Sequence, residues 1–300
     1  MKKVLISGGS GLVGSALSKK LIERGYTVNI LSRSPGEKDG IKAFEWDIEK
    51  AEIDMHAYKG VTAIIHLAGA GIADKRWTDK RKEIIIDSRV ESARLLYLGA
   101  VKAGIKLSAF VSASGINYYG SKTTDHIFVE TDPPSSEFIG DCCVQWEAAA
   151  DEFKDLTRVV KLRTGVVLSK KGGALDRMAQ PVKLGVGAPL GTGKQYIPYI
   201  HIDDLCEMYI YAIENEHVEG AYNACNGDYV NNVELTEALA RELNKPLWMP
   251  HVPEFALKLL FGEMAQIILY GSRASADKIK STGFEFNFQN MNQTLFDIYE

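Results

Sequence analysis

The sequence predicts an α/β protein with a doubly wound, mostly parallel sheet and a smaller C-terminal α/β lobe. The chain opens with an apolar strand, a glycine-rich turn and a helix. Strand-type and helix-type segments then alternate to about residue 168, as in parallel sheets with right-handed crossovers. Beyond that point a glycine-rich loop interrupts the pattern and the elements become shorter. Together these observations predict a Rossmann-type domain followed by a second lobe.

The opening segment, residues 4–14, predicts a bound ligand. An apolar strand runs directly into glycines spaced Gly8-x-x-Gly11-x-x-Gly14, and apolar residues at helical spacing follow. Such glycines let the backbone approach a pyrophosphate, and the free N–H groups of the helix N-terminus bind the anion. We therefore expect a dinucleotide here rather than a glycine turn that binds nothing. The predicted contacts are Gly8, Gly9, Ser10, Gly11, Leu12, Val13 and Gly14.

The end of the second strand, residues 27–31, indicates which dinucleotide is bound. An acidic residue about 20 positions after the glycines binds the ribose of NAD, whereas an arginine there accommodates the 2′-phosphate of NADP. Here the strand ends in Ser32, Arg33 and Ser34, with no acid. The planar guanidinium suits a phosphate, so NADP is favoured over NAD; the alternative is a solvated arginine in a turn. Asp47, after the third strand, could bind the adenine amino group or cap the following turn.

The middle of the chain supplies the rest of the predicted sheet. Residues 63–70 form an apolar strand that runs into small residues, which leave room for a cofactor at the carboxyl edge of a parallel sheet. His66, between apolar neighbours, is more typical of a core residue than of a catalyst. Further cofactor contacts are expected from Leu67, Ala68, Gly69 and Ser112. The other elements predicted here are strands at 41–46, 109–114 and 158–163 and helices at 79–103 and 141–153.

The second half of the chain is expected to form the other wall of one cleft. We predict a Rossmann domain over residues 1–168, with strand contributions from about 197–225, and a substrate lobe over 169–300. That lobe includes an extra C-terminal domain at about 248–297. Its predicted elements are a glycine-rich loop at 185–193, a helix beginning near residue 201, a strand at 221–225 and helices at 232–243, 253–261 and 263–270.

Composition excludes several classes of function. Thirty-five basic residues against 39 acidic ones give a formal net charge of −4, which predicts neither a nucleic-acid partner nor a membrane surface. No apolar run approaches the roughly eighteen residues of a membrane-spanning helix. The four cysteines have no CxxC spacing and no zinc-type histidine partners. We therefore expect free thiols, no metal site and a cytoplasmic protein.

Motifs along the whole chain resemble the extended short-chain dehydrogenase/reductase superfamily. The similarity is greatest to its NAD-dependent epimerase/dehydratase-like family that carries a short C-terminal domain of unknown function. Beyond the glycine turn, the matching stretches lie at residues 66–70, 112–120, 146–149, 162–168, 199–204, 262–264 and 283–286.

This resemblance implies hydride transfer with nicotinamide, a Ser that orients the substrate and a Tyr-x-x-x-Lys pair as acid/base. Ser114 matches the Ser position, but the Tyr and Lys positions hold Cys143 and Glu147. Proton transfer would then fall to Tyr119 (or Tyr118), or to Cys143, whose ordinary pKa is nearer neutrality than that of tyrosine. The alternatives are a small buried cysteine and tyrosines that only pack.

The substrate implied by the resemblance is a nucleotide sugar or a similar hydroxylated small molecule. Arg163, at the end of the sixth strand, and His201 are the predicted substrate contacts. Arg163 could instead form a structural salt bridge with Asp203, Asp204 or another acid, and His201 could simply pack. A homodimer through the long helices is also implied. The alternative function is an NADP(H)-dependent sensor or interaction protein without turnover.

Overall fold

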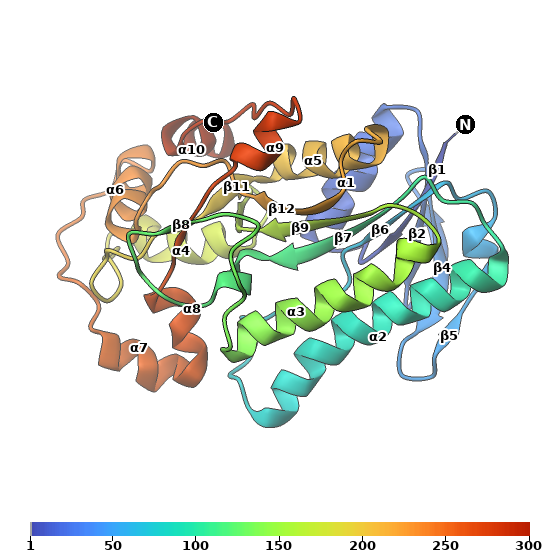
Figure 1. Ribbon diagram of the computed structural model, residues 1–300. Coiled ribbons are helices and arrows are strands. Elements are labelled where there is room, and N and C mark those ends of the chain that lie inside the picture. Colours follow the sequence, from blue (N-terminus) through green and yellow to red (C-terminus); the bar gives the residue numbers. More distant parts are fainter. Residues whose placement is uncertain (1) are drawn as a thin grey trace.

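The computed structural model describes residues 2–300, and its centre is a nine-stranded sheet (Figure 1). The order across the sheet is β12-β9-β7-β6-β1-β2-β4-β3, with β5 paired to β4. All neighbours from β12 to β4 are parallel, and β3 and β5 each pair with β4 antiparallel. The strands are β1 Lys3–Ser7, β2 Thr27–Ser32, β3 Gly36–Lys38, β4 Ile41–Asp47, β5 Glu52–Ile53, β6 Ala63–His66, β7 Ala109–Gly115, β9 Val159–Thr164 and β12 Gly220–Ala224.

Helices cover both faces of this sheet, as the doubly wound pattern predicts. In Figure 1, α1 (Leu12–Glu23) and α5 (Ile202–Glu214) lie on one face, and α2 (Asp79–Ala103) and α3 (Phe138–Asp151) lie on the other. Alternate residues of β1 enter the two cores, because successive strand side chains point to opposite faces. Val4 and Ile6 pack towards α1 and α5, and Leu5 packs towards α2.

Most of the remaining elements form a second lobe beside the carboxyl ends of the central strands. Three of its helices share one apolar core, and α7 and α8 share another with residues of the loop before them. The helices are α4 Ala174–Lys183, α6 Asn232–Glu242, α7 Glu254–Phe261, α8 Gln266–Leu269, α9 Asp277–Ser281 and α10 Met291–Tyr299. The short strands are β8 Ile127–Phe128, β10 Val166–Leu168, β11 Tyr199–His201 and β13 Arg273–Ala274. The 3-10 helices are η1 Met55–Tyr58, η2 Ile116–Tyr119, η3 Glu152–Asp155 and η4 Gly262–Ala265. Of these elements, η1 and η3 lie outside the second lobe and pack in the core beneath α2, whereas α9 packs in the core beneath α5.

The segment between η2 and α3 connects the two lobes. Its strand β8 pairs in parallel with β13 from the C-terminal part of the chain. The Asn223 amide of β12 donates to the carbonyl of Ser275, just beyond β13, at 3.1 Å. The C-terminal lobe therefore contacts the edge of the main sheet directly.

The predicted fold class is confirmed. Helix α2 has the expected bounds, whereas α3 begins at Phe138, earlier than expected. Strand β6 ends at His66 rather than at residue 70. Helices α4, α9 and α10 were not predicted. The division into domains at residue 168 remains a prediction, although β12, from the second half, does join the main sheet.

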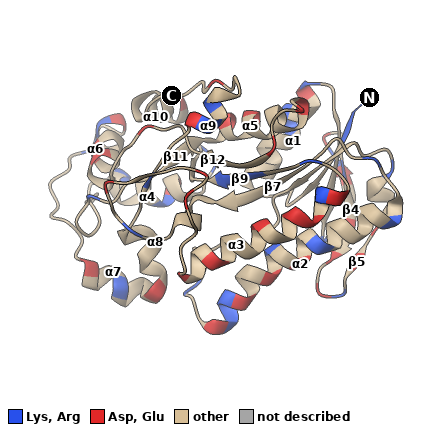
Figure 2. Cartoon of the chain, in the orientation of Figure 1, with Lys and Arg blue, Asp and Glu red and all other residues tan. Residues whose placement is uncertain are grey.

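Charged residues of both signs are mixed along α2, as Figure 2 shows. This agrees with the near balance of acidic and basic residues. Of the helices described between residues 2 and 300, none has both the length and the apolar character needed to cross a membrane.

Candidate functional site

The glycine turn after β1 is packed so tightly that side chains are excluded from it. Gly8 has a φ of +72°, and a Cβ there would lie 2.8 Å from the backbone nitrogen of Ala68. A Cβ on Gly14 would overlap the carbonyl oxygen of Gly8 and lie 2.7 Å from the Cα of Gly9. These glycines are therefore required by close backbone approaches between the turn, α1 and the end of β6.

The N-terminus of α1 is left open by this turn. Gly11 is the N-cap, no side chain caps the helix, and its first turn contains no acidic residue. The first N–H groups of a helix have no intrahelical partner, and together with the helix dipole they attract an anion. The predicted contacts Leu12 and Val13 supply backbone N–H groups here. This geometry suits the pyrophosphate of a dinucleotide.

Arg33 stands at the end of β2, next to this turn. β2 lies beside β1, with Ser7 aligned with Leu31. The Arg33 side chain is exposed, and within residues 2–300 no hydrogen bond or ion pair engages it. Its neighbour Ser34 donates its N–H to the hydroxyl of Ser32 at 3.1 Å. Arg33 is thus a cation available to a ligand at the glycine turn.

Asp47, the other predicted contact on this side, has a local partner. Its carboxylate accepts the backbone N–H of Lys50 at 3.1 Å and lies 3.0 Å from the Lys50 ammonium. The hydrogen bond from the Lys50 side chain lowers the pKa of Asp47 below its usual range. This is the turn-capping role that the sequence offered as the alternative to an adenine contact.

The end of β6 brings Leu67, Ala68 and Gly69 beside the glycine turn. His66 just before them is fully buried, and its Nδ1 lies 2.7 Å from the Ser7 hydroxyl. Burial lowers the pKa of His66 to about 4, so the ring is neutral near pH 7. His66 is therefore a core residue, as expected.

Arg89 on α2 is a residue that the sequence interpretation missed. Only 8% of it is exposed, yet no ion pair reaches it within the described part of the chain. Its guanidinium donates to the Ile85 carbonyl at 2.7 Å and lies 4.9 Å from the centre of the Trp146 ring. A Cβ on Gly69 would lie 3.1 Å from Arg89 Cζ. A buried cation without an anion, beside the small residues after β6, suits an anionic ligand.

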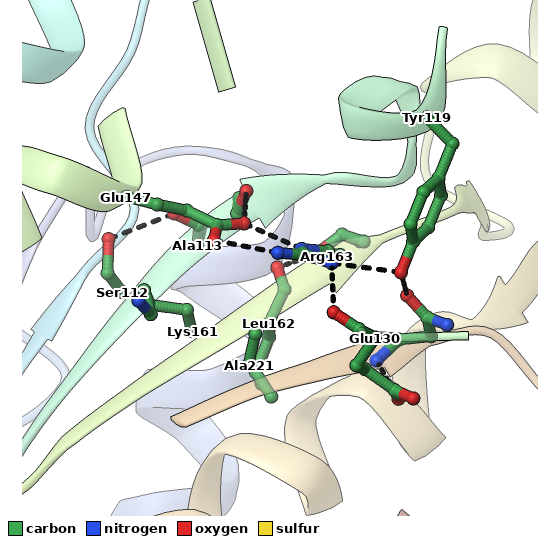
Figure 3. A network of polar contacts seen from close by, with 12 residues as sticks. Ser112, Ala113, Tyr119, Glu130, Glu147, Lys161, Leu162, Arg163 and Ala221 are labelled. Carbon is green, nitrogen blue, oxygen red and sulfur yellow. Dashed lines mark hydrogen bonds and ion pairs between the residues drawn. The ribbon is translucent and has the colours of Figure 1, made fainter. Parts of the chain in front are cut away.

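The side chains predicted for catalysis and substrate binding belong largely to one buried polar network (Figure 3). Arg163 of β9 binds the Glu147 carboxylate of α3 twice, from Nε at 2.8 Å and from Nη2 at 3.0 Å. Ser114 of β7 donates its hydroxyl to the same carboxylate at 2.8 Å. The partner of Arg163 is therefore Glu147, and neither Asp203 nor Asp204.

Tyr119 of η2 extends this network. Its hydroxyl accepts from Arg163 Nη1 at 2.9 Å and donates to Asn223 Oδ1 at 2.8 Å. Burial raises the pKa of Tyr119 above its usual range, which opposes its use as a base. The guanidinium of Arg163 lies 3.4 Å from the centre of the Tyr118 ring, so Tyr118 packs on the same cation.

Glu130, in the segment between η2 and α3, joins the network to β12 (Figure 3). Its carbonyl accepts from Arg163 at 3.1 Å, and its carboxylate accepts the backbone N–H of Asn223 at 2.8 Å. Ser114 is only 3% exposed, so a substrate can reach it only if neighbouring groups move.

A second ion pair repeats the contact between α3 and β9. Asp151 follows Glu147 by one helical turn, and Lys161 precedes Arg163 by two strand positions. Lys161 Nζ lies 2.8 Å from Asp151 Oδ1. One helical turn and two strand residues both advance by roughly 6 Å, so the two pairs match along the interface.

Cys143 occupies the position where the resemblance would place a tyrosine. Its side chain is buried, and burial raises its pKa to about 12. A Cβ on Gly115 would lie 3.2 Å from Cys143 Sγ. The ordinary pKa of a thiol is nearer neutrality than that of tyrosine, but burial moves the pKa of this thiol away from neutrality. The geometry fits a small residue that packs behind β7.

Two further predicted residues bind only to neighbouring protein groups. The hydroxyl of Ser112 donates to the Ala113 carbonyl at 2.9 Å. His201 is the N-cap of α5 and accepts the N–H of Asp203 at 3.1 Å. The His201 ring centre lies 3.8 Å from that of Phe288. Among the described residues, none of these contacts joins His201 to the network of Ser114 and Arg163.

Comparison with known proteins places the whole chain in one family. Residues 4–225 match the NAD dependent epimerase/dehydratase family, and residues 252–298 match a domain of unknown function. Epimerase family protein Mb2239 of Mycobacterium bovis is 35% identical over 97% of this chain and 96% of its own. Human epimerase family protein SDR39U1 is 32% identical over 99% of both chains.

The crystal structure of human SDR39U1 (isoform 2) with NADPH is also similar to this structure. It superposes with a TM-score of 0.89 at 31% identity, and the match covers 99% of each chain. These matches confirm the resemblance drawn from the motifs. The chain belongs to the NAD-dependent epimerase/dehydratase family.

Proposed function

We propose that this protein is an NADP(H)-dependent oxidoreductase of the epimerase/dehydratase type, acting on a hydroxylated small molecule such as a nucleotide sugar. The observation that carries the proposal is Arg33, an exposed cation without a partner among the described residues, beside an uncapped helix N-terminus. A relative of similar length was crystallised with NADPH. NAD is the alternative cofactor.

The residues around the glycine turn fit such a cofactor. The turn at Gly8 and the first N–H groups of α1 would hold the pyrophosphate, and Arg33 would hold the 2′-phosphate. Arg89 would offset negative charge near the end of β6. Once bound, the nicotinamide supplies hydride chemistry. Ser114, at the carboxyl end of β7, is the group proposed to contact the substrate, and Arg163 holds the carboxylate to which Ser114 donates.

A specific observation favours a second candidate, an NADP(H)-dependent sensor without turnover. Burial raises the pKa of both Tyr119 and Cys143, so neither titrates near neutrality. The enzyme proposal requires that single substitution of Ser114, Tyr119 or Cys143 lowers turnover. The sensor proposal requires cofactor binding without any turnover to lower.

Fluorescence titration with NADPH and NADH tests the cofactor. Arg33→Ala is expected to weaken NADPH binding by about tenfold or more, with little change for NADH, since one charge-assisted phosphate contact is lost. Lys106→Ala is the matched control. It removes one exposed positive charge before β7, at the amino edge of the sheet and away from the turn. Equal losses for the two variants, or no NADPH binding by the natural chain, would overturn the proposal.

We also propose a homodimer and a cytoplasmic location. Helix α2 exposes Ile84, Leu98 and Val101, an apolar surface that a second copy could cover. The four cysteines are free and buried, as is usual in a reducing compartment. Sedimentation of the natural chain and of Leu98→Glu would test the dimer: the variant should sediment as a monomer.

A further inference from the structure

The hydrogen bonds around Ser114 have a fixed direction. Arg163 can only donate, and the ionised carboxylate of Glu147 can only accept. Ser114 Oγ lies 2.8 Å from Glu147 Oε1. Because a serine hydroxyl carries a single proton, that proton must point towards Glu147. Only acceptor lone pairs of Ser114 are then left for a ligand.

The same reasoning fixes the proton of Tyr119. Its oxygen accepts from the Arg163 guanidinium, so its own proton goes to Asn223 Oδ1. The orientation of the Asn223 amide is set from the other side, where Nδ2 donates to the Ser275 carbonyl at 3.1 Å. Both hydroxyl protons of the network are therefore directed into the protein.

We propose that Glu147 is a positioning residue that makes Ser114 a hydrogen-bond acceptor, so that the site selects a ligand group that donates. The group expected at Ser114 is the hydroxyl of an alcohol rather than the oxygen of a ketone or aldehyde. This inference rests on the proposed function, in which Ser114 contacts the substrate.

The identity of residue 147 decides this direction. The superfamily resemblance implies a lysine here, and a lysine can only donate. A carbonyl oxygen placed against Ser114 would face lone pairs, and no proton of Ser114 or Tyr119 would be free to meet it. A site built to pair with a hydroxyl discriminates strongly against a group that cannot pair. With Glu147 in place, the site therefore prefers a ligand hydroxyl, whereas a serine whose proton is free prefers a carbonyl oxygen.

Neutron diffraction from deuterium-exchanged crystals tests the direction itself. The Ser114 deuteron is expected on the line to Glu147 Oε1. A deuteron that points away from Glu147 overturns the proposal. This measurement needs no cofactor and no substrate, so its result is independent of whether NADPH binds.

Small probes test the consequence for ligands. Ser114 is only 3% exposed, so 2-propanol and acetone are suitable as an alcohol and ketone of similar size. The amide signals of Ser114 and Gly115 are followed by NMR during titration with each. We expect half-saturation by 2-propanol at about one tenth of the acetone concentration, the ratio that one hydrogen bond gives. Equal responses overturn the proposal, and so does the absence of any response.

A double variant with exchanged charges tests whether Glu147 sets the direction of the Ser114 hydrogen bond or only packs between α3 and β9. In Glu147→Lys/Arg163→Glu the ion pair between α3 and β9 is retained with its sign exchanged, and Lys at 147 can donate to Ser114. The preference between the probes should then be reversed. Ser114→Ala is the control and should show no preference. If the folded double variant still prefers 2-propanol, Glu147 does not set the preference. If that variant does not fold, the position of the Ser114 deuteron in the neutron structure decides whether the proposal holds.

NADPH titration of the same proteins separates this inference from the proposed function. A charge-reversed variant that binds NADPH like the natural chain but keeps the alcohol preference refutes only the role of Glu147. Loss of NADPH binding in the natural chain refutes the proposed function and leaves the direction of the Ser114 proton unaffected.

Discussion

Removal of the Glu147 carboxylate should destabilise the protein far more than removal of an exposed acid in an equally short ion pair. In Glu147→Ala, the buried guanidinium of Arg163 loses both of its bonds to the carboxylate, and Ser114 loses its acceptor. The two side chains of this pair are only 9% and 4% exposed. Arg163 would keep its contacts with Tyr119 and with the carbonyl of Glu130, but neither carries a compensating charge.

The expected loss follows from this burial. Breaking a buried pair by removing one partner costs about 3–5 kcal/mol, and the two contacts that Arg163 keeps place this case near 3 kcal/mol. The control is Glu91→Ala on α2, whose carboxylate lies 2.8 Å from Arg94 but whose side chains are 48% and 51% exposed. Exposed pairs contribute about 0–1 kcal/mol. The distances match, but the control pair is exposed, and Arg94 also keeps the Glu152 carboxylate at 3.3 Å.

Thermal unfolding followed by circular dichroism measures the difference. For a chain of this length, about 3 kcal/mol corresponds to a fall in Tm of roughly 5 °C, and the control should change Tm by no more than about 1.5 °C. Urea midpoints should rank the three proteins in the same order. If Glu147→Ala and the control have the same Tm, the network contributes little stability and the reasoning from burial is refuted.

Three other results are expected. Gly14→Ala should abolish NADPH binding and lower Tm, because the added Cβ overlaps the Gly8 carbonyl. Gly36→Ala should do neither, because no atom lies within 4 Å of the Cβ added there. Ligand titration measures the binding, and thermal unfolding measures Tm. Burial lowers the pKa of His66 to about 4, below its unfolded value of about 6.5. The stabilisation that neutral His66 provides is therefore complete above about pH 6.5. As the pH falls towards 4, the free energy of unfolding should decrease by roughly 3 kcal/mol. A His66→Gln variant that loses stability just as steeply over this range would contradict the assignment. Iodoacetamide at pH 8 should not modify Cys143 in the native protein, since burial raises the pKa of this thiol to about 12 and the thiolate is the reactive form. Mass spectrometry should detect labelling of Cys143 only after unfolding.

The parts of this structure that could be predicted are those with local signals. The glycine turn is defined by residues adjacent in sequence, and its flanking strand and helix form where the pattern predicts them. The bounds of α2 were also predictable. Thr78 caps its N-terminus, and Gly104, with a φ of 59°, ends it in a left-handed conformation. Such signals need no knowledge of tertiary contacts.

The parts that could not be predicted depend on contacts between distant segments. Strands β8 and β13 have two residues each, too few for any periodicity. Helix α4 contains Pro181, a residue that usually argues against a helix interior. The pair of Glu147 and Arg163 forms only where α3 packs against β9. No local pattern in the sequence predicts which strand a helix will contact.

The bond between Asn223 and Ser275 has a consequence for any exchange of the C-terminal segment. Two matched regions meet in the chain, the epimerase/dehydratase region ending at residue 225 and the domain of unknown function beginning at residue 252. Yet the second supplies the carbonyl that orients Asn223, and Asn223 in turn receives the Tyr119 proton. An exchange of the C-terminal segment must therefore keep this backbone carbonyl in place, or the hydroxyl groups at the sheet edge lose the contact that orients Asn223.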